Sequence, residues 1–324
     1  MKFHLTNLIV LLVGTTTSVH AFGTALFPVS SSAQQQTFPT KDQREEIELP
    51  NFDELFGRIK QVSPLARTIL DDQENTSPGF AGLPKSFESP DLKWKRVESH
   101  KNRLVHEIEK IDNFQGLNAP LLRFRSSMQG PCDGEAFANF IMNLEDRKKW
   151  DAQIDNVYEA YTIDDLDMAN MAMGFNYGDC CRMGVGHCIT KANLGIDARE
   201  QLTICGINDF EDGSCIIWGT EMEDRHNYLF PPGPRTTRAR SHLFCTSLVP
   251  TGPTSFDVEY VIQLEIGGKI PTWMTTPIVI DNVKKMFSVV QKFFNNEGGE
   301  LEKFLEDKAK RNELTSGISF LMTP

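Results

Sequence analysis

The stretch "EIGGKIPTWMTTP", Glu265 to Pro277, separates an alternating strand pattern from a long helical pattern. Gly267 and Gly268 permit a sharp exit from a strand, because glycine adopts backbone angles that other residues avoid. Pro271 then blocks the strand, since proline lacks a backbone N–H and fixes its own φ angle. We therefore expect a sheet to pass here directly into a helix, through a junction that can serve as a hinge.

The segments on either side of this junction carry apolar faces. Upstream, apolar and polar residues alternate, which predicts a strand with one dry and one wet face. Downstream, apolar residues recur at helical spacing for about five turns, and such a stripe has to be buried. The helix should therefore lie on the dry face of the sheet. The dry face consists of Phe256, Val258, Tyr260, Ile262, Leu264 and Ile266, the wet face of Asp257, Glu259, Gln263 and Glu265, and the helical stripe of Val279, Val283, Met286, Phe287, Val290 and Phe294.

The remainder of the chain adds strands and short helices to this pair. Alternating patterns predict antiparallel strands in "RLVHEIEKI", "PLLRFRSSMQ", "EQLTICGI", "CIIWGTEM" and "RARSHLFCTSLV". Asp133 can cap a helix with apolar residues at helical spacing, and a charged turn, "EDRKKWD", follows it. Residues 51–70 predict a helix that docks on the domain. The fold class is therefore α+β, with an antiparallel sheet around a long C-terminal helix.

The composition of the 324 residues argues against several classes of function. A formal charge of -11 with scattered basic residues argues against nucleic-acid binding. Seven cysteines without framework spacing do not indicate a disulfide-stapled protein. The sequence has no nucleophile elbow, nucleotide-binding glycine loop or zinc-protease motif. We therefore expect no enzymatic activity, no cofactor and no metal.

The first 45 residues predict targeting. Residues 1–21 have one lysine, a short apolar core and small residues before the end, as in a signal peptide. Residues 22–45 start with Phe22 and contain hydroxyl residues but no acid before Asp42. The Ala21–Phe22 junction resembles the bipartite presequences that carry proteins through the secretory pathway into plastids of algae with secondary plastids. The alternative is a secreted or endomembrane-lumen protein in which residues 22–45 form a linker.

Four stretches together resemble the START lipid-transfer family. In chain order, "EDRKKWD", "DAREQLTIC", "RTTRARSHLF" and "GGKIPTWM" are similar to the family's R-K-x-W-D, R-D-F, R-A and G-x-x-P-x-W patterns, although Glu200 and Gln201 replace the usual Asp and Phe. The resemblance extends over residues 52–294. It implies the helix-grip fold, a curved antiparallel sheet wrapped around the long C-terminal helix with an internal lipid cavity. The domain would cover residues 46–300, and residues 301–324 would form a charged tail.

The resemblance implies a monomeric, non-enzymatic carrier of one glycerolipid or sterol-like lipid that contacts membranes transiently. At about 0.8 kcal/mol per CH₂, a sixteen-carbon chain costs roughly 13 kcal/mol to hold in water, so a carrier has to enclose it. Arg199 and Arg238 can donate to a head group, although salt bridges are the alternative. Sterol-holding members can carry a buried acid–arginine pair, and Cys205 stands at the arginine position, so we expect this pair to be absent.

The expected ligand-binding residues come from the strands and from the long helix. The alternative is that these side chains simply pack against one another. They are Arg199, Thr203, Cys205, Trp218, Arg238, Phe256, Val258, Tyr260, Ile262, Leu264, Trp273, Val283, Met286, Phe287 and Val290.

Other functions stay open from the sequence. Related helix-grip cavities host cyclases and hydrolases, and Glu221, His226 or His242 could then act as acid or base. Polar side chains converging inside the cavity would favour an enzyme, whereas apolar walls would favour a carrier. A lipid-loaded sensor that docks a protein partner is a third possibility. Zinc binding or a thiol switch is conceivable, despite the poor spacing of adjacent cysteines, at Cys180, Cys181, His187 and Cys188.

Overall fold

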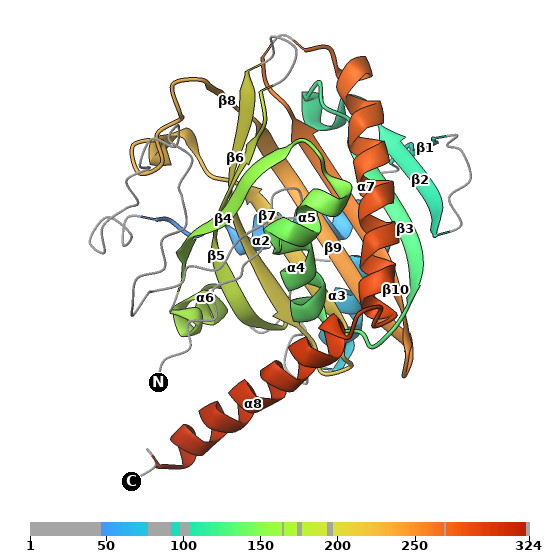
Figure 1. The fold of residues 1–324 in the computed structure, drawn as a ribbon, viewed down its shortest axis with the longest axis vertical. Coiled ribbons are helices and arrows are strands. Elements are labelled where there is room, and N and C mark those ends of the chain that lie inside the picture. The colour runs from blue at the N-terminus through green and yellow to red at the C-terminus, as the bar shows by residue number, and fades with distance from the viewer. Residues whose placement is uncertain are drawn as a thin grey trace.

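A large sheet curved around one long helix dominates the architecture (Figure 1). The structure is a computed structural model that describes residues 47–76, 92–97, 104–163, 165–173, 177–192, 197–268 and 270–321. The gripped helix is α7, Thr272–Phe294. The arrangement is therefore the α+β helix-grip fold that the sequence predicts.

The described strands form one sheet in the order β1-β2-β3-β10-β9-β7-β6-β5-β4. Neighbours in this order pair antiparallel, and β8 pairs with β6 in parallel. The strands are β1 (Lys95–Arg96), β2 (Val105–Ile111), β3 (Leu121–Gln129), β4 (Ile154–Thr162), β5 (Asp179–Thr190), β6 (Ala198–Asp209), β7 (Cys215–Glu221), β8 (Thr236–Arg238), β9 (Arg240–Gly252) and β10 (Ser255–Glu265).

Helices cover both faces of the sheet, and each face has its own hydrophobic core. We call the face toward α7 the inner face and the opposite one the outer face. The inner face is covered by α4 (Gly134–Met142), α5 (Leu144–Trp150) and α7, and the outer face by α2 (Phe52–Val62), α3 (Pro64–Thr76) and α6 (Leu166–Met173). Two short 3₁₀ turns are η1 (Phe114–Gly116) and η3 (Asp224–His226), and α8 (Glu300–Leu321) extends away from the body (Figure 1).

The junction between β10 and α7 has the geometry that its glycines suggest. Gly267 and Gly268 have φ angles of 75° and 73°, a region that favours glycine. A Cβ atom on Gly267 would lie 2.7 Å from the carbonyl oxygen of Arg238. The helix begins at Thr272, directly after Pro271, and Pro277 lies inside it, where it cannot donate to the carbonyl four residues earlier.

The centre of the outer face of β10 is buried, which contradicts the predicted wet face there, whereas Asp257 and Glu265 toward the ends of the strand are partly exposed. Glu259 is 1% exposed and accepts hydrogen bonds from Ser63 Oγ at 2.5 Å and from the Leu65 N–H at 3.1 Å. Gln263 is fully buried and donates to the carbonyls of Phe114 and Ala119. These polar side chains therefore satisfy backbone and hydroxyl groups of the segments that cover the sheet.

The predicted docking helix over residues 51–70 is two helices. Asn51 caps α2 by accepting from the Glu54 N–H at 3.2 Å, and a single residue, Ser63, separates the end of α2 from Pro64, where α3 begins. Phe52 and Phe56 of α2 pack edge-on against Trp218, which fixes this helix on the outer face. The docking was therefore predictable, but the break at Pro64 was not.

Two charged segments are helical. The predicted turn "EDRKKWD" contains α5, in which Arg147 lies 2.9 Å from Asp151 and stacks over Trp150 at 3.8 Å. The predicted tail contains α8, whose Lys308 lies 2.7 Å from Asp133 at the start of α4. The C-terminal segment is thus attached to the domain.

Candidate functional site

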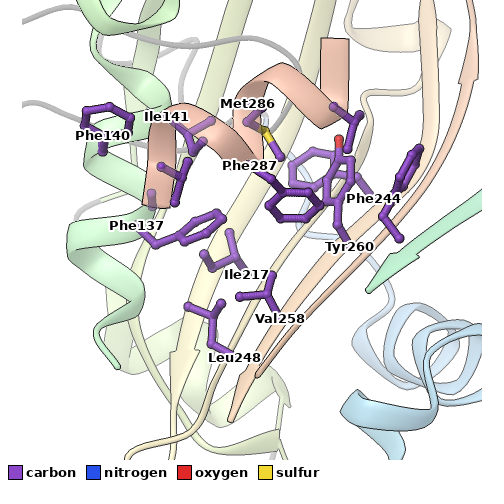
Figure 2. Packing of buried hydrophobic residues seen from close by; sticks show 14 of the residues in the cluster. Phe137, Phe140, Ile141, Ile217, Phe244, Leu248, Val258, Tyr260, Met286 and Phe287 are labelled. Atoms are coloured by element: carbon purple, nitrogen blue, oxygen red, sulfur yellow. The ribbon is translucent and has the colours of Figure 1, made fainter. Parts of the chain in front are cut away.

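The apolar interior between the inner face and α7 contains most of the expected ligand-binding residues. Figure 2 shows aromatic and aliphatic side chains from β7, β9, β10, α4 and α7 pointing toward one another. The ring centroids of Tyr260 and Phe287 are 6.4 Å apart, and those of Phe256 and Phe294 are 5.0 Å apart. This interior holds the expected residues Cys205, Phe256, Val258, Tyr260, Ile262, Val283, Met286, Phe287 and Val290, with Leu264 packed against it, and also Phe124, Phe137, Ile217 and Phe244, which the sequence reading did not single out.

The chain's own side chains fill much of this interior. A void of about 10 Å³ lies under the first turns of α7, lined by Leu122, Leu264, Thr275 and Val279 among others. Ligand pockets usually measure about 300–1,000 Å³. This void by itself is therefore far smaller than such a pocket.

A buried ion pair lies on the inner face beside Cys205. Arg182 of β5 is 3.4 Å from Glu159 of β4, and their side chains are 11% and 1% exposed. Both charges act on the Cys205 thiol, whose pKa is raised well above its ordinary value, mainly by burial. Burial also lowers the pKa of Arg182, and Glu159 opposes that shift. The expectation that Cys205 leaves this place without an acid–arginine pair is therefore wrong, because neighbouring strands supply one.

The polar end of the inner face lies next to the junction between β10 and α7. Arg199 donates to the carbonyls of Asp197 at 2.5 Å and of Gly267 at 3.5 Å. Gln201 and Thr203 follow on the same face of β6, and Ser241 pairs in register with Leu264 of β10. Four buried atoms here have no hydrogen-bond partner among the described residues, namely Arg199 Nε, Gln201 Oε1, Thr203 Oγ1 and Ser241 Oγ. Buried polar atoms normally have partners, so this end is suited to a polar ligand group.

Three expected ligand-binding residues lie outside the interior. Trp218 packs on the outer face and donates from Nε1 to Asn208 Oδ1 at 2.7 Å. Arg238 lies 3.4 Å from Glu200 and donates to the Phe230 carbonyl at 2.7 Å. Trp273 is 74% exposed at the start of α7. The placement of Trp218 in a cavity was wrong because neighbouring strand residues point to opposite faces.

Glu159 and Arg182 were missed by the sequence reading. Arg182 follows adjacent cysteines, and its register with Ile207 puts it on the inner face. Gly184 and Gly186 follow Arg182 on the same face of β5, and neither has a side chain. The available signal was an arginine followed by two glycines at alternate positions of one strand. The glycines carry no side chains, so this pattern indicates free space beside a charged group.

The proposed zinc ligands do not converge. His187 accepts from or donates to Tyr158 at 2.6 Å and Glu200 at 3.2 Å, whereas Cys188 lies in the inner core and Cys180 in the outer one. Among the described residues, no three His, Cys, Asp or Glu side chains form a group that could hold a metal ion.

The candidate acids and bases lie away from the apolar interior. Glu221 and His226 line a cleft of about 340 Å³ together with Arg58 of α2. His242 Nδ1 is 2.6 Å from Glu221 Oε1, and its Nε2 is 3.2 Å from Glu265 Oε2. Arg240 lies 3.7 Å from Glu221 and adds a positive charge. His242 thereby links the end of β7 to the end of β10, two residues before Gly267.

This link predicts pH-dependent stability. The hydrogen bond to Glu221 is the largest cause of a raised pKa for His242. The stabilisation should be complete below the unfolded pKa of about 6.5 and should be lost as the pH rises through the higher folded pKa. Denaturant titrations should therefore show that His242→Gln loses most stability near about pH 6 and less near about pH 9. A constant difference between these pH values would contradict the prediction.

The start of α7 exposes apolar side chains. Met274 is 46% and Ile278 53% exposed, and both lie near Trp273 on the helix. We call Trp273, Met274, Pro277 and Ile278 the apolar tip of α7. No helix in the described part of the chain is long and apolar enough to cross a membrane.

The comparisons with known proteins agree with this geometry at the level of the fold. The sequence matches no family model and no curated protein. Human STARD10 is similar with a TM-score of 0.51 and 15% identity, over 79% of this chain and 86% of that chain. Human StAR-related lipid transfer protein 5 is similar with a TM-score of 0.49 and 16% identity, over 75% of this chain and 98% of that chain. The described chain therefore has the helix-grip fold of a START domain, as its four motifs predicted.

Proposed function

We propose that the protein binds one lipid between the inner face of its sheet and α7, and moves it between membranes. The observation that carries this proposal is the set of unpartnered polar atoms of Gln201, Thr203 and Ser241, which lie together at one end of a largely apolar interior. The resemblance of the four motifs to a lipid-transfer family supports it. A ligand with an apolar chain and a polar group matches such an interior at both ends.

The distribution of apolar and polar side chains in the interior indicates where the apolar and polar parts of the ligand would bind. Acyl or ring carbons would replace contacts among Phe244, Tyr260, Met286 and Phe287, at a gain of about 0.8 kcal/mol per buried CH₂. The polar group would meet Thr203 and the atoms around it near the hinge. The Glu159–Arg182 pair offers a second polar contact on the same face.

Movement of α7 would open the interior from the hinge side. At the other end of α7, Gln291 accepts from the Gln129 N–H at 3.0 Å and donates to the Gln129 carbonyl at 2.9 Å. These bonds hold the end of α7, and the proposal places the hinge at its start. The void under Thr275 lies where such an opening would begin.

Native mass spectrometry after incubation with mixed phospholipid and sterol vesicles tests the proposal. We expect one lipid per chain, and lipid analysis of the bound fraction identifies its class. Thr203→Val should reduce binding of ligands with a polar group while the fold is retained, because it removes a hydroxyl at nearly constant volume. A protein that stays empty with every vesicle composition would contradict lipid binding.

The apolar tip of α7 predicts the site of membrane contact. Trp273→Ala should slow lipid uptake from vesicles by roughly tenfold, because indole rings favour the membrane interface. Stability should be unchanged, since Trp273 is 74% exposed. Met171→Ala on α6, where the side chain is 83% exposed, is the matched control and should leave uptake unchanged. Equal rates for both variants would place the contact elsewhere.

We also propose delivery to a plastid through the secretory pathway, from the Ala21–Phe22 junction. Residues 1–46 lie outside the described residues, so this proposal rests on sequence. A fluorescent protein fused after Thr40 should enter the plastid, and secretion of the fusion would contradict the proposal.

A further inference from the structure

The cleft beside α2 lies on the outer face of the sheet, across the sheet from the apolar interior. It measures about 340 Å³ and is lined by α2, by the end of β7 and by the η3 turn. Ligand pockets usually measure about 300–1,000 Å³, so a small molecule fits. Part of the wall is apolar and is formed by Leu55, Ile204 and Met222. The cleft thus has the size and the mixed lining of a small-molecule site.

His226 of η3 brings a buried hydrogen-bond donor to this cleft. The residue is 5% exposed, and its Nε2 atom accepts from the Glu48 N–H at 3.5 Å. A backbone N–H can only donate, so Nε2 carries no proton and the neutral ring has its proton on Nδ1. Nδ1 is buried and has no hydrogen-bond partner among the described residues. His226 therefore offers an N–H group that needs an acceptor.

Arg58 of α2 brings a second donor to the same cleft. Its Nη2 atom donates to the His242 carbonyl at 3.4 Å, whereas Nε is buried and has no partner in the described part of the chain. Burial lowers the pKa of Arg58, and the negative charges of Glu54 and Glu221 oppose that shift. A carboxylate of a ligand would accept from Nε and stabilise the cation. Two donors without acceptors in one cleft therefore indicate a ligand with a carboxylate group.

A larger cleft beside α3 differs in this respect. It measures about 410 Å³ and also contains an arginine, Arg125. The guanidinium of Arg125 lies 2.7 Å from Glu259 and 2.9 Å from Glu107. The protein's own carboxylates thus compensate this charge and accept its hydrogen bonds. The comparison favours the cleft beside α2 as the one that is built for a ligand.

The cleft beside α2 has more acids than bases. Two arginines line it, against four glutamates, namely Glu48, Glu54, Glu221 and Glu223. This excess of negative charge disfavours a ligand that is only anionic, such as phosphate, and favours one that also has a positive group. A zwitterion with one carboxylate and one ammonium group matches both the unsatisfied donors and the surrounding acids.

We propose that this cleft binds a free amino acid with an apolar side chain. The carboxylate accepts from Arg58 Nε and His226 Nδ1, and the ammonium group lies among the glutamates. The apolar side chain packs on Leu55, Ile204 and Met222. Both nitrogen atoms are buried, so binding includes a side-chain movement that uncovers them. The site is on the opposite face of the sheet from the lipid interior, and the inference does not depend on lipid binding.

Isothermal titration calorimetry of the full-length chain with three related probes tests the proposal. L-leucine should bind with a Kd below about 1 mM, and L-valine, L-methionine and L-phenylalanine extend the series. Leucinamide lacks the carboxylate, and N-acetyl-leucine lacks the ammonium group. Each of these two analogues should bind at least about tenfold more weakly than L-leucine.

The variant Arg58→Met tests the role of the guanidinium. It should bind L-leucine at least about tenfold more weakly than the unmodified chain and should no longer prefer L-leucine to leucinamide. Arg96→Met, at an exposed position of β1, is the matched control and should keep this preference. Circular dichroism checks that both variants are folded, and the comparison of the three probes on the unmodified chain requires no variant.

Several results would overturn the inference. One is the absence of binding for all four amino acids. Equal binding of L-leucine and leucinamide would show that the cleft does not recognise a carboxylate. Equal binding of L-leucine and N-acetyl-leucine would show that the glutamates do not select an ammonium group. Equal weakening of L-leucine and leucinamide in Arg58→Met would give Arg58 a structural role only.

Discussion

Replacing Glu159 by alanine is expected to lower the free energy of unfolding by about 3–5 kcal/mol. The change leaves Arg182 charged on the inner face, with a side chain that is only 11% exposed and without the carboxylate at 3.4 Å. It also removes the acceptor for Thr162 Oγ1, which donates to Glu159 at 2.5 Å. Urea titration followed by circular dichroism measures the loss.

A paired substitution separates the cost of an isolated charge from the loss of packing. Glu159→Ala combined with Arg182→Met should recover most of the stability, since a buried pair is often replaced by apolar groups at little cost. If the single variant costs less than about 1 kcal/mol, water reaches the pair, and it behaves as a surface ion pair. Equal losses in the single and double variants would assign the effect to packing alone.

Fixing α7 to the sheet is expected to reduce lipid exchange by at least about tenfold. Leu264 and Thr275 line the same void on opposite sides of the hinge. Cysteines at these positions should form a disulfide that holds the start of α7 against β10. A vesicle-to-vesicle transfer assay with a fluorescent lipid measures the exchange.

Reduction of the engineered disulfide should restore exchange, and each single-cysteine variant should exchange at the unmodified rate. Circular dichroism of the oxidised protein checks that the fold is kept. Unchanged exchange by the oxidised protein would make α7 a static part of the core. The entrance would then lie elsewhere, and the loop Asn208–Ser214 between β6 and β7 is the next candidate.

The sequence predicted that α7 packs on β10, because each element has a long and regular pattern of apolar residues. Apolar residues alternate from Phe256 to Leu264 and recur at helical spacing from Val279 to Val290. The two apolar faces are both buried when the helix packs on the strand. The same reasoning failed on the opposite face of β10. Polar residues such as Glu259 and Gln263 look solvated in a sequence, but here they satisfy backbone groups of segments far away in the chain.

The apolar part of the candidate site could be predicted from the sequence, whereas the polar part could not. Each apolar residue of the interior belongs to a periodic pattern. Glu159 and Arg182 come from different strands, and their meeting depends on bulges in β4 and β5 that shift the register. Gln201 Oε1 and Ser241 Oγ lack hydrogen-bond partners because of their surroundings in the folded interior, which no local sequence pattern indicates.

The hydrogen bond between Ser63 and Glu259 has a consequence for the order in which the chain folds. It joins residues 196 positions apart, so α2 and α3 are synthesised long before the strand on which they rest. Such distant contacts slow folding, because a long loop has to close before they can form. The first helices thus have no finished surface to dock on until β10 has left the ribosome.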